Sequence, residues 1–273
     1  MLPGRSRRHR SSTRTSRRSA LASQISVHMA PLPVPRQMSL EVVMVEEATP
    51  SVRRIVFAGE ALRGFVYAPG QDVMLSLGAA ANGAVKRRYS IRRVNAAAAT
   101  LEINVVVSGS GPGATWANRV QAGDIVAEVV APRGKITVDA RAPWHLFVGD
   151  DTAVPAMLNM TESLPQGAPA WQIFEVDSKA DEVPVESRPE GSVSWLHRRG
   201  RSPGYGAGLL QALARFPIPS GPGHAYLAGE AQTVLSMRDL LVARGVPRNQ
   251  LSVKAYWRMD AANLDRGEPQ SLE

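Results

Sequence analysis

The sequence contains no cysteine. This absence excludes disulfide bonds, thiolate zinc sites, cysteine-ligated iron–sulfur clusters and a cysteine nucleophile. No run of about eighteen apolar residues occurs, so we expect no membrane span. Histidines are few and fit no metal-ligand spacing, so we expect no metal held by side chains. The histidines are His9, His28, His145, His197 and His224.

Acidic residues are missing from one end of the chain, and this explains the basic excess. Residues 1–36 contain eight arginines and no Asp or Glu, so the rest of the chain carries 24 basic and 24 acidic side chains. The net charge of +8 therefore does not describe the body of the protein, and we expect it to bind no nucleic acid. With 44% apolar and 21% charged residues, the 273-residue chain is typical of a globular protein with room for two domains.

The Arg- and Ser-rich segment 1–36 has three interpretations. Its composition buries too little apolar surface to fold, which predicts a disordered or non-native tail, with Met29 and Met38 as later starts. Acid-poor leaders of this kind also occur in targeting peptides, although residues 20–27 are too few and too polar for an export signal. A nucleic-acid-binding arm is the third interpretation.

From Met38 onward, short β-rich segments are separated by Gly, Pro and Asn. Six such segments and one short helix at 113–120 are typical of a small antiparallel barrel. After Lys135 strands alternate with helices, which predicts an open parallel sheet. The predicted strands are 39–45, 51–57, 72–77, 88–92, 101–107, 124–130, 145–148, 170–176, 224–227 and 251–256; the later helices are 152–163, 208–216 and 231–244, and 191–208 is predicted as loop.

The fold class is therefore an antiparallel β-barrel followed by an α/β domain with a parallel sheet. The predicted boundaries place a basic tail at 1–36, the barrel at 37–141, the α/β domain at 142–260 and a C-terminal tail at 261–273.

The first candidate site is the segment Lys-Arg-Arg-Tyr-Ser-Ile-Arg at 86–92. Side chains alternate along a strand, so Arg87 and Tyr89 face one way while Arg88 and Ser90 face the other. A guanidinium suits a pyrophosphate because it donates paired hydrogen bonds. A nearby tyrosine can lie against a flat ring, and a hydroxyl can bond a flavin nitrogen. A solvated basic edge strand is the alternative interpretation.

Three turns lead directly into predicted helices. Gly-Pro-Gly at 111–113 leaves backbone N–H groups where an anion can bind, and Thr115 adds a hydroxyl. Gly-Asp-Asp-Thr at 149–152 lies between a predicted strand and a predicted helix, as a phosphate-binding turn does, although it lacks the Gly-x-Gly-x-x-Gly pattern. Ala-Gly-Glu at 228–230 also lies where a strand ends and a helix begins. Ordinary helix capping is the alternative for such turns. Tyr-Trp-Arg at 256–258 ends the last strand at the same sheet edge, where open α/β sheets bind ligands.

In this order the motifs resemble the siderophore-interacting protein family, flavin-dependent ferric-siderophore reductases of the ferredoxin-reductase-like group. The resemblance covers residues 38–258, and it depends on shared order and spacing because each motif is modest alone. The motifs are Pro-x-x-Arg-Arg at 50–54, Arg-x-Tyr-Ser at 87–90, Gly-Pro-x-x-x-Trp-Ala at 111–117, Ala-Gly-Asp at 122–124, Gly-Asp-x-Thr-Ala-x-Pro-Ala at 149–156, Ala-Gly-Glu at 228–230 and Tyr-Trp-Arg at 256–258.

The resemblance implies FAD on the barrel and NADPH or NADH on the α/β domain. Arg87 would bind FAD phosphate, Tyr89 would pack on the flavin, and Ser90 would touch its ring nitrogens. The other implied positions are Gly113, Ala114, Thr115 and Trp116 at the pyrophosphate and Asp150, Thr152, Ala153 and Glu230 at the nicotinamide. Arg258 would contact an anionic ferric chelate, with Arg92, Arg93 and Arg133 as further candidates.

The implied function is a cytoplasmic NAD(P)H-dependent ferric-siderophore reductase with the ferric siderophore as its substrate. Hard oxygen ligands hold Fe(III) far better than Fe(II), so one-electron reduction releases the metal. The flavin carries the redox chemistry, and no catalytic side chain is assigned. A ferredoxin is an alternative electron donor. Arg198, Arg199 and Arg201 could contact the 2′-phosphate of NADPH, and solvated loop arginines are the alternative interpretation of this cluster.

Three positions depart from the family pattern. Ser108 stands where a histidine is usual, Ala131 replaces a glycine, and Met-Asp at 259–260 replaces another. The Ser108 change supports an alternative function, a siderophore-binding or iron-sensing flavoprotein without turnover. A general flavin or quinone reductase is a second alternative.

Overall fold

The computed structural model describes residues 37–80, 83–185, 188, 190–201 and 206–259. All of them belong to one compact unit, residues 33–273. The predictions for the tails 1–36 and 261–273 concern residues outside these ranges. No helix within the ranges is long and apolar enough to cross a membrane.

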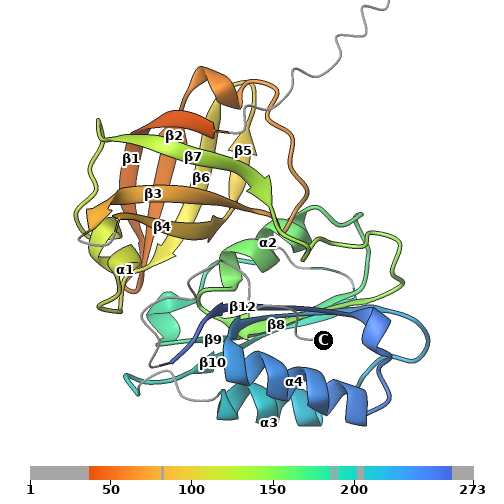
Figure 1. Cartoon of the computed structure of the whole chain (residues 1–273). Helices are drawn as coiled ribbons and strands as arrows, with labels where there is room; N and C mark the ends of the chain where they lie inside the picture. Colours follow the sequence, from red (N-terminus) through yellow and green to blue (C-terminus); the bar gives the residue numbers. More distant parts are fainter. Residues whose placement is uncertain (1–36, 81–82, 186–187, 189, 202–205, 260–273) are drawn as a thin grey trace, which may run out of the picture. The chain divides into compact units, whose positions relative to one another are not determined.

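Seven antiparallel strands form the first sheet, in the order β4-β3-β7-β1-β2-β6-β5 (Figure 1). Alternation builds its core: in β6 every second side chain (Leu101, Ile103 and Val105) is buried. Between β4 and β5 no hydrogen-bonded ladder forms among the described residues, so closure into a barrel stays a prediction. The strands are β1 (Gln37–Thr49), β2 (Val52–Ala58), β3 (Asp72–Ala80), β4 (Gly83–Ser90), β5 (Arg93–Asn95), β6 (Thr100–Val106) and β7 (Ile125–Arg133), with η1 (Glu60–Leu62) and α1 (Pro112–Ala117) between them.

Five parallel strands form the second sheet, in the order β10-β9-β8-β11-β12. The chain runs outward from β8 to β10 on one side and then crosses to β11 and β12 on the other. The strand order therefore reverses beside β8, and ligands of open α/β sheets bind at such a point. The elements are β8 (His145–Asp150), α2 (Val154–Glu162), β9 (Ala170–Val176), η2 (Lys179–Asp181), β10 (Gly191–His197), α3 (Ala207–Arg215), β11 (His224–Glu230), α4 (Ala231–Ala243), η3 (Arg248–Gln250) and β12 (Leu251–Trp257).

An antiparallel domain followed by a parallel α/β domain is thus confirmed, and two local predictions were wrong. The loop predicted at 191–208 begins with β10, an edge strand that is too exposed to show an apolar run. The strand predicted at 88–92 runs instead from Gly83 to Ser90, and the short β5 follows it. The boundary between domains at 141 and 142 stays a prediction.

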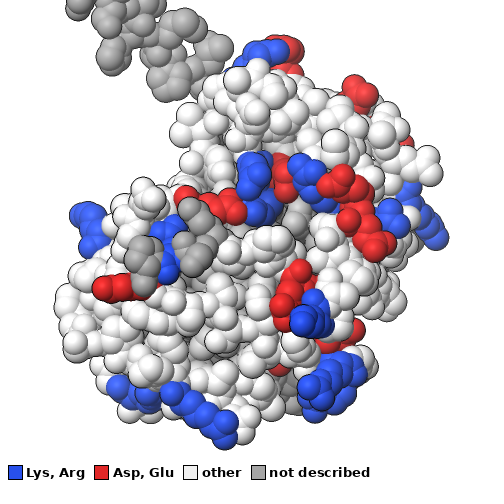
Figure 2. Space-filling model, turned by 180° about the vertical axis from the view of Figure 1, so that it is seen from behind, with Lys and Arg blue, Asp and Glu red and all other residues white. Residues whose placement is uncertain are grey.

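Charges on the surface are mixed. On the face that Figure 2 shows, basic and acidic side chains lie next to one another. This agrees with the equal numbers of basic and acidic residues after residue 36.

A histidine lies inside the second core. Every residue of β8 is buried, and the His145 ring is parallel to the rings of Phe147 and Tyr226, each at 6.2 Å between centroids. Phe147 and Tyr226 stack on each other at 4.7 Å. Burial lowers the pKa of His145 from 6.5 to about 4, since the charged ring would lose its hydration.

This buried ring should make the fold sensitive to acid. Between pH 6.5 and 4 the unfolded chain binds a proton that folded His145 excludes, so the free energy of unfolding decreases as the pH falls through this window. We expect His145→Phe, which keeps a flat ring, to reduce that loss by on the order of 2 kcal/mol. Urea unfolding of both proteins at pH 7 and pH 4 measures the difference; equal losses would contradict the assignment.

Candidate functional site

Strand β4 presents two sets of side chains, as its alternation predicts. Arg87 and Tyr89 face α1: a Cβ placed on Gly113 would lie 2.8 Å from Tyr89 Oη and 3.9 Å from Arg87 Cγ. The Tyr89 and Trp116 rings lie 5.8 Å apart between centroids. Four of the residues predicted to bind FAD, from two segments of the chain, therefore lie together.

Unpaired polar atoms mark this cradle, which we define as Arg87, Tyr89, Gly113 and Trp116. Arg87 Nη1 donates to the carbonyl of Lys86, at 2.7 Å, whereas buried Arg87 Nη2 has no protein partner, and neither has buried Tyr89 Oη. Burial raises the pKa of Tyr89, so its hydroxyl stays protonated and able to donate. Buried donors of this kind are rare without a partner. An unpaired guanidinium donor and a tyrosine hydroxyl beside a small glycine fit the phosphate and ring edge of FAD.

The turn beside the cradle is less enclosed. Ala114 is half-buried and Thr115 is exposed at the start of α1. Gly113 is the residue of this turn that closely approaches β4, which explains why a side chain is absent there.

The opposite face of β4 meets the second sheet. Ser90 Oγ donates to Tyr256 Oη, at 3.2 Å, and Arg88 Nη1 donates to Asp72 Oδ1, at 2.6 Å. Tyr256 lies near the end of β12. The Ser90 hydroxyl, which was predicted to touch flavin nitrogens, thus lies at the contact between β4 and β12.

At the carboxyl edge of the parallel sheet, the carboxylate of Asp150 accepts hydrogen bonds from two other residues that were predicted to bind the nicotinamide. Asp150 Oδ1 accepts from the backbone N–H of Thr152 at 3.0 Å and from its hydroxyl. Asp150 Oδ2 accepts from the N–H of Glu230 and from Trp257 Nε1, each at 2.9 Å. Asp150 is buried, and this burial raises its pKa. Asp150 therefore ties the ends of β8, β11 and β12 together.

Two of the predicted nicotinamide residues also stabilise the fold. Glu230 Oε2 accepts from Thr233 N at 2.8 Å and so caps α4. Ala153 is fully buried, and its methyl group packs against Gly149. Ala153 therefore exposes no surface that a ligand could contact directly.

The three arginines after β10 are not equivalent. Arg198 is buried and ion-paired with Asp151, and its Nη1 lies 4.0 Å from Glu175 Oε2. Burial, together with the charge of Asp150, raises the pKa of Asp151 to about 6. Arg198 is therefore occupied inside the fold, whereas Arg199 and Arg201 are exposed.

The arginines predicted to contact the chelate differ in whether they are already ion-paired. Arg92 forms a two-point ion pair with Glu162, at 2.8 and 2.6 Å, and Arg93 reaches the same carboxylate at 3.3 Å. Arg133 and Arg258 are exposed. Arg133 lies opposite Asp72 in the β3–β7 register, close to the β4–β12 contact.

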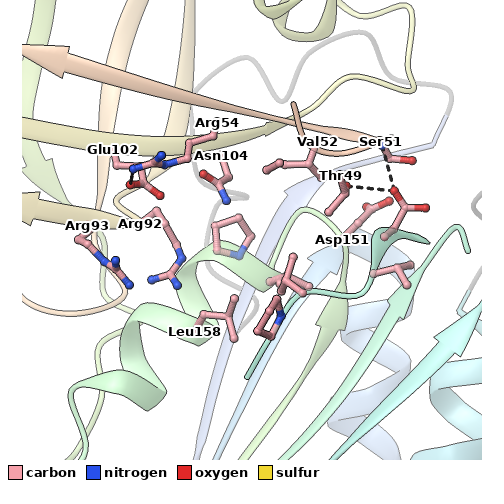
Figure 3. A pocket seen from close by; sticks show the side chains of 17 residues that line it. Thr49, Ser51, Val52, Arg54, Arg92, Arg93, Glu102, Asn104, Asp151 and Leu158 are labelled. Atoms are coloured by element: carbon pink, nitrogen blue, oxygen red, sulfur yellow. Dashed lines mark hydrogen bonds and ion pairs between the residues drawn. The ribbon is translucent and has the colours of Figure 1, made fainter. Parts of the chain in front are cut away.

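A cavity of about 210 Å³ lies between residues of both sheets (Figure 3). Its apolar wall comes from α2 (Val154, Pro155 and Leu158), and Asn104 of β6 contributes a buried Oδ1 that has no partner. At the end where Thr49 and Ser51 lie, Asp181 accepts from Thr49 Oγ1 at 3.0 Å and from Ser51 N at 2.9 Å. Sequence reasoning missed this cavity, because its lining comes from separate segments without a common motif.

Among the residues that the structure describes, no group of three or more His, Asp or Glu side chains could hold a metal ion.

Comparison with known proteins identifies related sequences for both domains. Residues 142–260 match the model named siderophore-interacting protein, and residues 78–136 match the siderophore-interacting FAD-binding domain. The ferric vibriobactin reductase ViuB of Vibrio cholerae is 30% identical over 179 residues, 64% of this chain and 65% of that protein. The NADPH-dependent ferric-chelate reductase of Escherichia coli is 24% identical over 160 residues, 58% of this chain and 60% of that protein. The matches thus cover less than two thirds of the length of each of these relatives.

Solved structures are similar over a larger part of the chain. A siderophore utilization protein from T. fusca is 32% identical, with a TM-score of 0.77 over 84% of this chain and 95% of that one. The siderophore-interacting protein SipS from Aeromonas hydrophila, 24% identical, has the same fold, with a TM-score of 0.70 over 83% of this chain and 100% of that one.

The close approach at Gly113 can be tested. In Gly113→Ala the new methyl group would lie 2.8 Å from Tyr89 Oη, so the ring or the turn has to move. We expect a loss of about 1–3 kcal/mol in the free energy of unfolding, measured in urea. Gly111→Ala is the matched control: its Cβ would meet no atom within 4 Å, so we expect a change below about 0.5 kcal/mol. Equal effects of the two variants would refute the packing described here.

Proposed function

Because the chain belongs to the siderophore-interacting protein family, we propose that it is an FAD-dependent reductase of ferric siderophores that uses NAD(P)H. The observation that carries this proposal is the cradle on β4 and α1. There two buried polar atoms, on Arg87 and Tyr89, lie unpaired inside the segment that matches the FAD-binding model. Bound FAD supplies the chemistry that side chains lack, accepting a hydride and releasing single electrons.

The residues of β4 and α1 would hold the cofactor. Arg87 would donate its free Nη2 to a phosphate, and the exposed Thr115 hydroxyl, with the backbone at Gly113 and Ala114, would complete the pyrophosphate contacts. Tyr89 and Trp116 form a joint aromatic surface for a flat ring. Ser90 would donate to a ring nitrogen and would then accept a hydrogen bond from Tyr256 Oη, the hydroxyl to which it now donates.

The carboxyl edge of the parallel sheet would receive the pyridine nucleotide. Thr152 and Glu230 lie there, and Asp150 fixes both of their backbones. The cavity beside α2 adjoins this edge, because Asp151 lines it. Arg199 and Arg201 are exposed cations that could contact the 2′-phosphate of NADPH, whereas Arg198 is already paired. A ferredoxin remains the alternative donor.

The substrate would be an iron chelate that brings its own ligands. Arg258 follows Trp257 at the sheet edge and is exposed, as is Arg133, so both can attract an anionic complex. Arg92 and Arg93 contribute less because they share the carboxylate of Glu162, which leaves a net charge of +1 between them. Reduction weakens the hold of hard oxygen ligands on iron, so Fe(II) is released without a protein ligand set. We place this reaction in the cytoplasm, where NAD(P)H is supplied.

Spectroscopy and turnover test the proposal together. We expect the purified chain to bind FAD. The absorbance of the bound flavin, at about 450 nm, should disappear on addition of NADPH or NADH. With a ferric tris-catecholate or tris-hydroxamate complex, it should then form Fe(II), trapped by a chromogenic Fe(II) chelator. FAD binding without Fe(II) formation would identify a binder or sensor, and failure to bind FAD would refute the assignment altogether.

Arg87 provides the sharpest single test of the cradle. Arg87→Ala removes the guanidinium that would pair with a phosphate, which we expect to weaken FAD binding by about 1.5–3 kcal/mol, or roughly 10- to 100-fold. Titration of the apoprotein with FAD measures this. Arg119→Ala, which removes an equal charge from an exposed position just after α1, is the control. An unchanged affinity in Arg87→Ala, or an equal loss in both variants, would contradict the role of Arg87.

A further inference from the structure

A buried carboxylate connects the flavin strand with the last strand of the parallel sheet. Asp72, the first residue of β3, is only 3% exposed. Its Oδ1 accepts from Arg88 of β4 at 2.6 Å, and its Oδ2 accepts from Lys254 of β12 at 2.5 Å. Each oxygen of this carboxylate thus takes one cation, and the two cations come from different sheets.

The same two strands meet at a second point. Ser90 lies two residues after Arg88 on β4, and Tyr256 lies two residues after Lys254 on β12, so each pair shares a face of its strand. Ser90 Oγ donates to Tyr256 Oη, and Lys254 Nζ lies 5.3 Å from the centroid of the Tyr256 ring. Side-chain contacts therefore join β4 and β12 at two points, through five residues that we call the β4–β12 clamp: Asp72, Arg88, Ser90, Lys254 and Tyr256.

The backbone just after β7 closes over the ion pair. Gly134 has a φ of +114°, and a Cβ on it would lie 3.2 Å from Lys254 Nζ and 3.4 Å from Asp72 Oδ2. Any larger residue would crowd the ammonium group and would adopt a strained backbone. The fold thus leaves space for this carboxylate and ammonium pair at the junction.

Stability alone is a poor explanation for such a group. The desolvation of two buried charges takes up most of the free energy that their attraction gains. We therefore interpret this buried pair as one that specifies a single arrangement of the strands. Here the arrangement in question is the position of Tyr256 relative to Ser90. The carboxylate also reduces the local charge from two cations to a net +1.

We infer that Asp72 is a positioning residue for the flavin site: through Arg88 and Lys254 it holds Tyr256 against Ser90. The inference rests on the proposed function to the extent that Ser90 borders the flavin. Tyr256 then has one defined position at the edge where the ring and the nicotinamide meet. Without Asp72 two cations lose their shared partner, β12 loses its charged attachment to β3, and Tyr256 becomes mobile.

Fluorine NMR on the full chain tests this without any cofactor. The chain has five tyrosines, so 3-fluorotyrosine labelling gives few resonances, and Tyr256→Phe assigns the one of interest. In the apoprotein we expect the Tyr256 resonance to show little H₂O/D₂O isotope shift. In Asp72→Asn this shift should rise toward the value of free fluorotyrosine. Lys254→Met, which leaves the Asp72–Arg88 pair intact and so protects the fold, should have the same effect.

Turnover gives the second readout. In the FAD-loaded protein we expect Asp72→Asn to lower kcat about 10- to 100-fold, because misplacement near the reacting groups is costly. The KM for NAD(P)H should change less than about threefold, because the nucleotide contacts are untouched. Glu128→Gln is the matched control, since it breaks the more exposed Lys86–Glu128 pair on β4 and β7. It should leave the Tyr256 resonance and kcat unchanged.

The outcomes separate this inference from the proposed function. An unchanged Tyr256 resonance in both Asp72→Asn and Lys254→Met overturns the clamp, and so does an equal change in Glu128→Gln. A protein that binds no FAD refutes the proposed function, while the fluorine measurement on the apoprotein still decides the clamp. Thermal unfolding of each variant verifies that the resonances belong to folded protein.

Discussion

The period-two alternation of β4 is the constraint on which the candidate site depends. It directs Arg87 and Tyr89 toward α1, and on the other face it directs Arg88 toward Asp72 of β3 and Ser90 toward Tyr256 of β12. One strand thereby serves two surfaces, a cradle of unpaired donors on one face and a junction with the second sheet on the other. A one-residue slip of register would exchange the two sets and abolish both surfaces.

Buried carboxylates join what the chain order separates. Asp72 connects β3 with β4 and β12, Asp150 connects the ends of β8, β11 and β12, and Asp181 connects η2 with the turn between β1 and β2. Each is nearly inaccessible to solvent, and each accepts hydrogen bonds at both of its oxygens. Carboxylates suit this role because two oxygens can take donors from several directions at once. The same burial raises the pKa of Asp150, whereas hydrogen bonds to Asp181 lower its pKa.

The arginines illustrate how exposure changes the interpretation of a charge. From the sequence, Arg258, Arg93 and Arg92 are candidates for contacting an anionic chelate, and Arg198 is a candidate for contacting a 2′-phosphate. In the structure Arg198 is buried against Asp151, and Arg92 and Arg93 share the carboxylate of Glu162, although Arg93 stays exposed. Arg258 is exposed just after the last strand of the parallel sheet. A side chain already neutralised by a carboxylate offers little to a substrate.

The sequence by itself determined the order of the two domains and most strands, because these depend on local periodicity and on short-range spacing, and it predicted a cofactor motif at 87–90. It failed at β10, where an exposed edge strand lacks an apolar pattern. Only the tertiary structure decided which charges are paired, where the cavity beside α2 lies, and that Asp72 meets Lys254 across 182 residues. Those facts depend on which distant segments become neighbours in the fold, and a local pattern of residues does not predict these neighbours.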